Sequence, residues 1–140
     1  SRTFVVGEAN PAQRALFAVT QDAEEAALEA LRSGAPVAHV YAAVDAVVEA
    51  GAAPFFPAGS LALPGFVGHG VGLELDEPPV LWPRDDTVLQ EGMVLALEVE
   101  VSAPERGIMT KLEDTVVIRS GACEVLTHAP RTLIACDLVP

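Results

Sequence analysis

The sequence has few cysteines. Of its 140 residues two are cysteines, Cys123 and Cys136, and they are too far apart for a Cys-x-x-Cys pair. Two thiols in a chain of this length argue against the disulfide framework on which small secreted domains depend. We therefore expect a protein of a reducing compartment, the cytoplasm.

Positive charge is scarce as well. Lys and Arg together number 8, against 20 Asp and Glu, and the formal net charge is −12. Nucleic acids and anionic membrane surfaces are bound by basic faces, so this balance argues against either as a partner. Most of the surplus carboxylates are expected to be solvated, and a few of them are candidates for metal ligands.

Long apolar runs are missing too. None approaches the roughly 18 to 20 residues that a membrane-spanning helix needs, and no basic stretch leads into an apolar one near the first residue, as it would in a signal peptide. Apolar residues are nonetheless abundant, at 51% of the chain with a mean hydropathy of +0.37. That content excludes a disordered tail and is enough for the core of one domain.

The order of elements along the chain indicates an α+β fold. Asn10-Pro11 is a helix start, and apolar residues recur at helical spacing from there to Gly34 and again from Pro36 to Gly51. Strands are expected at 1–6, 66–75, 93–101, 109–118, 123–126 and 131–135. Two helices followed by several strands predict an antiparallel sheet covered by helices.

Three short segments carry the residues that could do chemistry. In the first, His69 lies between two glycines, which let a ligand or backbone approach the imidazole closely. A surface turn with an incidental histidine is the alternative. In the second segment, 93–101, strand alternation puts Glu98 and Glu100 on one face. These glutamates are either solvated or, because burying a lone carboxylate is costly, paired or bound to a metal.

The third segment, 109–118, places Lys111, Glu113 and Thr115 on one strand face, where a solvated Lys–Glu pair is the alternative to a functional role. One histidine and two glutamates on separate strands can converge on a point. Imidazole together with hard carboxylate oxygens suits divalent first-row ions such as Mn, Fe, Co or Zn. The residues therefore predict a metal site that includes His69.

Four motifs then occur in an order typical of a known family. The segments SRTFVVG, GHGVGLELDEPP, EGMVLALEVE and KLEDTVVI begin at Ser1, Gly68, Glu91 and Lys111. They resemble the pita-bread metallopeptidases, which comprise the methionine aminopeptidases, the Xaa-Pro aminopeptidases and the Xaa-Pro dipeptidases (prolidases). The resemblance implies the pita-bread α+β fold, two divalent ions (Mn, Co or Zn), a proline-containing peptide substrate and a homodimer.

The resemblance also implies roles for individual residues. His69 matches the family's metal-binding histidine, Glu98 the glutamate that ends the Gly-Met-Val strand, and Glu113 the glutamate that bridges both ions. Glu98 and His69 are the catalytic candidates, with Glu98 moving the proton while a metal-bridging hydroxide attacks the peptide bond before proline. Asp76 and Lys111 are the candidates for binding substrate.

Two aspartate ligands of the family have no counterpart in the chain. The second of them precedes the family's [TS]-R-T-F strand by one intervening residue, and here that strand begins at Ser1. The resemblance therefore implies that residues 1–140 are the C-terminal part of a catalytic domain whose upstream portion carries both aspartates. Such a piece is expected to have little or no activity alone.

Three positions depart from the family pattern. Asp76 stands where many members have a histidine that contacts substrate or the tetrahedral intermediate, and Gly65 replaces a further histidine of prolidase-like members. Lys111 stands where the prolidase group has arginine, so a two-pronged hydrogen bond is lost. Asp76 could instead hold a substrate ammonium or an imidazole, or be a surface residue. Two alternatives therefore stay open: a peptide- or protein-binding pseudoenzyme on the same fold, and a metal-free creatinase-like C–N hydrolase.

Overall fold

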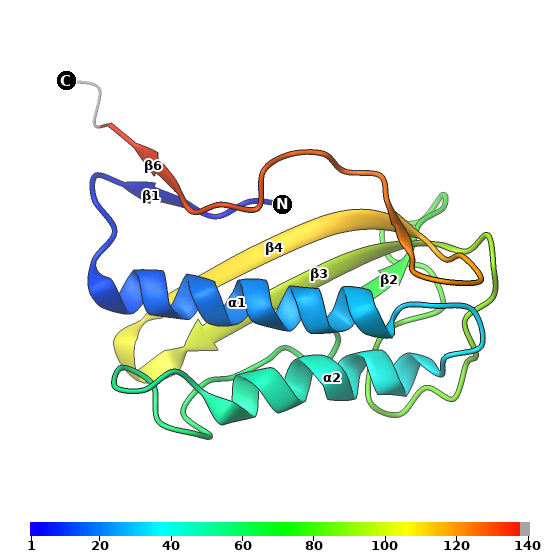
Figure 1. The fold of residues 1–140 in the computed structure, drawn as a ribbon, viewed down its shortest axis with the longest axis horizontal. Helices are drawn as coiled ribbons and strands as arrows, with labels where there is room; N and C mark the ends of the chain where they lie inside the picture. The colour runs from blue at the N-terminus through cyan, green and yellow to red at the C-terminus, as the bar shows by residue number, and fades with distance from the viewer. Residues whose placement is uncertain (138–140) are drawn as a thin grey trace.

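Two helices cover one face of a four-stranded antiparallel sheet in the computed structural model, which describes residues 1–137 (Figure 1). The helices are α1 (Pro11–Ala30) and α2 (Val37–Ala50). The sheet has the order β2-β3-β4-β5, with β2 at Gly68–Gly70, β3 at Val94–Ala103, β4 at Ile108–Val117 and β5 at Glu124–Val125. This is the α+β arrangement that the sequence predicts.

A smaller parallel pair joins the two ends of the described chain. Strand β1 (Phe4–Val6) pairs with β6 (Ile134–Cys136), and the pair lies along the outer edge of β4 (Figure 1). Just before β1, the Thr3 hydroxyl donates to the Lys111 carbonyl at 2.8 Å and accepts from the Lys111 amide at 2.9 Å. These bonds bring the first residues of the chain to the middle of β4.

Both helices form where the sequence predicts them. The Asn10 side chain accepts a hydrogen bond from the Gln13 amide, and the Gln13 side chain accepts one from the Asn10 amide, which is a capping box. Helix α1 ends at Ala30 rather than at Gly34, which lies in the connection to α2 with a φ of 87°. Helix α2 ends at Gly51, whose φ of 67° is readily adopted by glycine.

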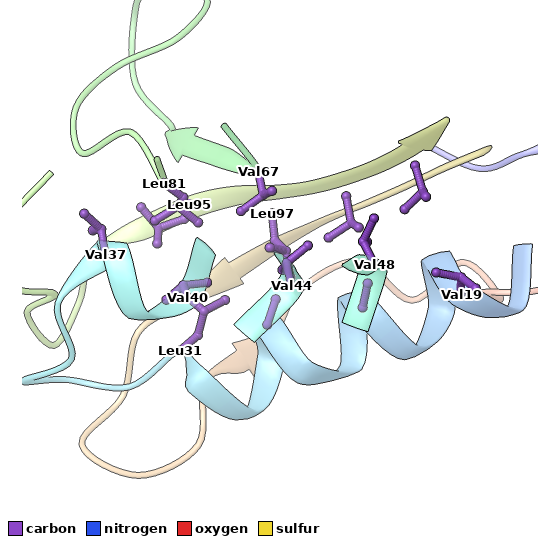
Figure 2. Close-up of a cluster of buried hydrophobic side chains, with 14 of the residues drawn as sticks. Val19, Leu31, Val37, Val40, Val44, Val48, Val67, Leu81, Leu95 and Leu97 are labelled. Atoms are coloured by element: carbon purple, nitrogen blue, oxygen red, sulfur yellow. The ribbon is translucent and has the colours of Figure 1, made fainter. Parts of the chain in front are cut away.

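The core lies between the helices and the inner face of the sheet (Figure 2). Helix α2 contributes a stripe of fully buried valines at helical spacing, and β3 contributes alternate residues that face them. The labelled side chains of the stripe are Val37, Val40, Val44 and Val48, opposite Leu95 and Leu97. Each such side chain stabilises the fold by about 1.5–3 kcal/mol through burial. No helix among residues 1–137 is long and apolar enough to cross a membrane.

The predicted strand 66–75 is wrong beyond Gly70. Gly70 and Glu77 exchange backbone hydrogen bonds, at 2.7 Å to the Glu77 carbonyl and 3.3 Å to the Gly70 carbonyl, and this pair closes a loop over residues 71–76. Inside the loop the Glu77 carboxylate accepts hydrogen bonds from the amides of Leu73 and Glu74 at 2.5 and 2.8 Å. The amides of Leu73 and Glu74 are thus satisfied by a side chain, whereas the Val71 amide still donates to the Val94 carbonyl of β3 at 3.0 Å.

Candidate metal centre

Three adjacent strands bring His69, Glu98 and Glu113 to one face of the sheet. In the register of β2 with β3, His69 lies opposite Ala96, and in that of β3 with β4, Glu98 lies opposite Glu113. Side chains alternate along a strand, so Ala96 and Glu98 share a face. That face points away from the helices, because the intervening residues of β3 are the ones buried in the core. The three side chains thus share one face of the sheet, while the expected convergence on a single point stays a prediction.

The imidazole of His69 faces two carboxylates. Its Nε2 is 3.4 Å from Glu98 Oε1 and 3.2 Å from Asp76 Oδ1. Its Nδ1 is 2.9 Å from the Gly70 carbonyl, which can only accept, so we assign the proton of the neutral ring to Nδ1. In this tautomer the Nε2 lone pair faces carboxylate oxygens, and a cation bound between them would satisfy all of these acceptors.

The group is compact enough for one ion. One donor atom from each of His69, Asp76 and Glu98 lies within 4.8 Å of the other two. The side chains of His69 and Glu98 are 12% and 14% exposed, whereas that of Asp76 is 50% exposed. The group is thus embedded in the sheet on one side and open to solvent through Asp76 on the other.

Lys111 is bound to the second oxygen of Glu98. Its Nζ donates to Glu98 Oε2 at 2.5 Å, which leaves Oε1 directed at His69. Partial burial acts to lower the pKa of the Lys111 ammonium, but the hydrogen bond to Glu98 and the charges of nearby carboxylates outweigh it, and the pKa is raised. Lys111 is therefore a fixed positive charge at the edge of the group.

Glu113 lies beside this group and has a different partner. Its Oε2 accepts a hydrogen bond from the Ser1 hydroxyl at 2.5 Å. Burial acts to raise the pKa of Glu113, but the hydrogen bond from the Ser1 hydroxyl and the charge of Lys111 act to lower it, and the pKa lies below its ordinary value. Glu113 is an ionised carboxylate next to Glu98, yet it does not belong to the 4.8 Å group of His69.

A small pocket opens next to the same residues. A cavity of about 240 Å³ is lined by the apolar Pro64 and Phe66 together with Glu98, Glu100 and Lys111. A pocket of the same volume between β1, α1 and β4 is lined by none of the candidate site residues. Of the two, the pocket at Lys111 is the one from which a bound molecule could reach Glu98.

Sequence reasoning missed a buried charge cluster on the inner face of β4. Asp114, whose side chain is fully buried, accepts from Arg2 at 2.6 Å and also from the Arg131 guanidinium. Glu24 of α1 is 1% exposed and lies 3.5 Å from Arg131 Nε, with neither carboxylate oxygen in a hydrogen bond. Strand alternation could have found the cluster, because it puts Asp114 in the apolar row of its strand.

This cluster also contacts the backbone of β4 next to a candidate site residue. Arg2 donates to the carbonyl of Glu113 at 2.8 Å as well as to Asp114. Arg2 therefore holds the backbone of β4 at Glu113, whose side chain lies on the opposite face of the sheet from Asp114. Burial raises the pKa of Glu24 to about 7, with a further upward contribution from the charge of Asp114.

Comparison with known proteins gives concordant matches. Residues 1–120 match the sequence model of Metallopeptidase family M24. An Xaa-Pro dipeptidase of Pyrococcus furiosus is 34% identical over 135 residues, which are 96% of this chain and 36% of that protein. The prolidase from Pyrococcus horikoshii OT3 superimposes with a TM-score of 0.80 at 31% identity, over 95% of this chain and 36% of its own.

A protein named for a different role also shares the fold. The N-terminal domain of the FACT complex subunit SPT16 from chickpea (Cicer arietinum) superimposes with a TM-score of 0.78 at 25% identity, over 94% of this chain and 33% of its own. The chain thus spans about a third of the length of the proteins that it matches.

Proposed function

The chain belongs to metallopeptidase family M24, and from this membership we propose that it is the metal-bearing part of a peptidase that cleaves the bond before proline. The pita-bread α+β fold expected from the sequence is that of the prolidase on which it superimposes. The substrate class is taken from the name of the Xaa-Pro dipeptidase relative. Because the chain spans about a third of that relative, the activity is proposed for the complete enzyme, with residues 1–140 inactive or very weak alone.

The residues on the outer sheet face fit a divalent ion. The observation that carries the proposal is the meeting of the His69 Nε2 lone pair with carboxylate oxygens of Glu98 and Asp76 at 3.4 and 3.2 Å. Imidazole nitrogen with carboxylate oxygens is a donor set that first-row divalent ions accept. We propose His69, Glu98 and Glu113 as ligands, with two aspartates supplied by upstream residues.

When bound, divalent ions in this donor set would polarise the scissile carbonyl and lower the pKa of water at the site. The chain's own residues have separate tasks beside this. His69 is kept in one orientation by its bond to the Gly70 carbonyl. Glu98 takes the proton of the attacking water and returns it to the leaving nitrogen, and Lys111 holds the other oxygen of the same carboxylate.

The pocket beside Glu98 is proposed to receive the substrate. Its apolar residues Pro64 and Phe66 suit a proline ring or an apolar side chain, and the Lys111 ammonium suits a peptide carboxylate or carbonyl. Asp76 is proposed to act on the opposite side of Glu98, at His69. Substrate binding by Lys111 would then compete with its hydrogen bond to Glu98. Substrate entry would thus release Glu98 Oε2 from the ammonium.

The test is hydrolysis of Xaa-Pro dipeptides and longer Xaa-Pro peptides by the full-length protein after chelation and readdition of Mn²⁺, Co²⁺ or Zn²⁺. We expect turnover only with metal, and losses of at least about 100-fold in kcat for Glu98→Gln. Glu29→Gln is the matched control, since Glu29 is an exposed acid of α1, outside the candidate site and its pocket. Equal losses in both variants, or turnover that survives chelation, would reject the proposed mechanism. Turnover that survives chelation would favour the metal-free creatinase-like alternative.

A non-catalytic peptide- or protein-binding domain is the second candidate function. The ion pair of Lys111 with Glu98 favours it, because the ammonium neutralises a proposed ligand without any ion. The superposition on the chickpea FACT subunit domain is a likeness of fold that accompanies this observation. Metal analysis of the full-length protein separates the two candidates, since two ions per chain support the peptidase and none supports the binding domain.

We also propose a cytoplasmic homodimer. Cys123 and Cys136 are both free thiols, which suits a reducing compartment, and the dimer follows from the resemblance to the family. Sedimentation velocity of the full-length protein tests the assembly, and a monomer at micromolar concentration would exclude it.

A further inference from the structure

We infer that Asp76 is a direct ligand of the ion held by His69 and Glu98, in addition to the ligands proposed above. The inference rests on the proposed function, because it needs an ion at His69. It concerns a position at which the family resemblance implies a histidine and this chain has aspartate. A further carboxylate in the ligand set would favour a hard ion such as Mn²⁺ over Zn²⁺.

The loop 71–77 delivers Asp76 to the imidazole. The paired backbone bonds of Gly70 with Glu77 make a short antiparallel bridge. His69 and Asp76 are the residues immediately before the two members of this bridge, and they occupy diagonal positions on one face of it. The 3.2 Å separation of His69 Nε2 from Asp76 Oδ1 follows from that pairing.

The loop itself is built around a different carboxylate. Glu77 accepts the amides of Leu73 and Glu74, and a Cβ added at Gly72 would lie 2.0 Å from its Oε2. The Glu77 carboxylate is therefore occupied by hydrogen bonds within the loop, and the absence of a side chain at Gly72 leaves space for it. The carboxylate of Asp76 has no such structural task and faces the imidazole.

The charges around Asp76 favour a metal ion over a proton as the group that joins the three acceptors. Lys111 already neutralises Glu98 Oε2, so the atoms left facing one another are Glu98 Oε1, Asp76 Oδ1 and His69 Nε2. A proton on Nε2 can form one strong hydrogen bond, whereas a divalent ion contacts three donor atoms at once. Their mutual distances of at most 4.8 Å allow such contacts.

The experiment measures metal affinity and not turnover. Mn²⁺ and Zn²⁺ are titrated separately into the chelator-stripped full-length protein by isothermal calorimetry. Asp76→Asn should weaken Mn²⁺ binding at least tenfold, since loss even of an outer-shell partner costs about 10- to 100-fold. Glu74→Gln is the matched control, because Glu74 is an exposed acid of the same loop whose side chain is outside the group, and its affinity should match the wild type.

A second variant tests the hardness of the ligand. Asp76→His exchanges a carboxylate for an imidazole, which suits Zn²⁺ better than Mn²⁺. We expect the ratio of Mn²⁺ to Zn²⁺ affinity to fall at least tenfold. Both affinities are measured on the same variant, so a loss of stability lowers them alike and leaves their ratio unchanged. An unchanged ratio would mean that residue 76 does not touch the ion.

The outcomes separate this inference from the function on which it rests. If the wild type binds no divalent ion, the proposed metal centre fails and Asp76 with it. If the wild type binds Mn²⁺ and both Asp76→Asn and Glu74→Gln bind it equally well, the metal centre stands and Asp76 takes no part in it.

Discussion

The buried carboxyl of Glu24 should make the stability of the fold depend on pH in a specific direction. Its pKa is raised from 4.5 to about 7, chiefly by burial and then by the charge of Asp114, against lowering contributions from Arg131 and Arg2. Below pH 4.5 the carboxyl is protonated in both folded and unfolded states. Between pH 4.5 and about 7 the unfolded chain releases the proton while the folded protein keeps it, so stability falls as pH rises.

The size of this effect follows from linkage. A shift from 4.5 to about 7 corresponds to about 3 kcal/mol of unfolding free energy, present at pH 4 and lost by pH 8. Glu24→Gln removes the titrating group. The difference in unfolding free energy between wild type and this variant should therefore change by about 3 kcal/mol across that range, whatever its value at one pH.

Urea unfolding followed by circular dichroism at pH 4 to 8 measures the difference. Glu25→Gln is the matched control, since Glu25 is exposed on the same helix and the substitution removes the same charge. Its difference from wild type should stay nearly constant. Parallel pH curves for wild type and Glu24→Gln would refute the reasoning, because the buried carboxyl would then not be titrating in this range.

Three further predictions concern stability and are checked by the same urea titration. Asp114→Asn should cost about 3–5 kcal/mol, because it leaves two partly buried arginines without their shared carboxylate. Val44→Ala should cost about 2–3 kcal/mol, because Val44 is fully buried between α2 and the sheet. Gly68→Ala should cost at least about 2 kcal/mol, because the added Cβ would lie 2.4 Å from the Ala96 carbonyl. Gly65→Ala, where a Cβ has open space, should change stability by less than about 0.5 kcal/mol.

The parts of the fold that sequence predicts well are those with a local physical cause. Asn10 and Pro11 start α1 because a capping side chain and a preset φ act within one turn. In β3, alternation put Glu98 on the face opposite the apolar row, where a carboxylate is either solvated, paired or bound to a metal. The same rule applied to β4 would have identified Asp114 as a buried acid in need of cations.

What sequence could not supply are contacts between distant segments. The loop at 71–76 reads as strand because its apolar residues alternate; the Glu77 carboxylate that turns it binds amides only three and four residues away, so this error is one of local pattern and not of distance. Arg2 and Arg131 meet at Asp114 from opposite ends of the chain. No local pattern reports such a meeting. Likewise, Lys111 was expected to bind substrate, and that assignment stays a proposal, while its bond to Glu98 required the register of β3 with β4.

The central claim is that the outer sheet face holds divalent ions through His69, Glu98 and Glu113. Equilibrium dialysis of the chelator-stripped full-length protein against Mn²⁺ tests it most directly. We predict about two ions per chain at saturation, and a loss of binding in His69→Ala that is absent in His39→Ala, whose imidazole is exposed on α2. Saturation with no bound ion, or equal binding by the wild type and both variants, would contradict the account.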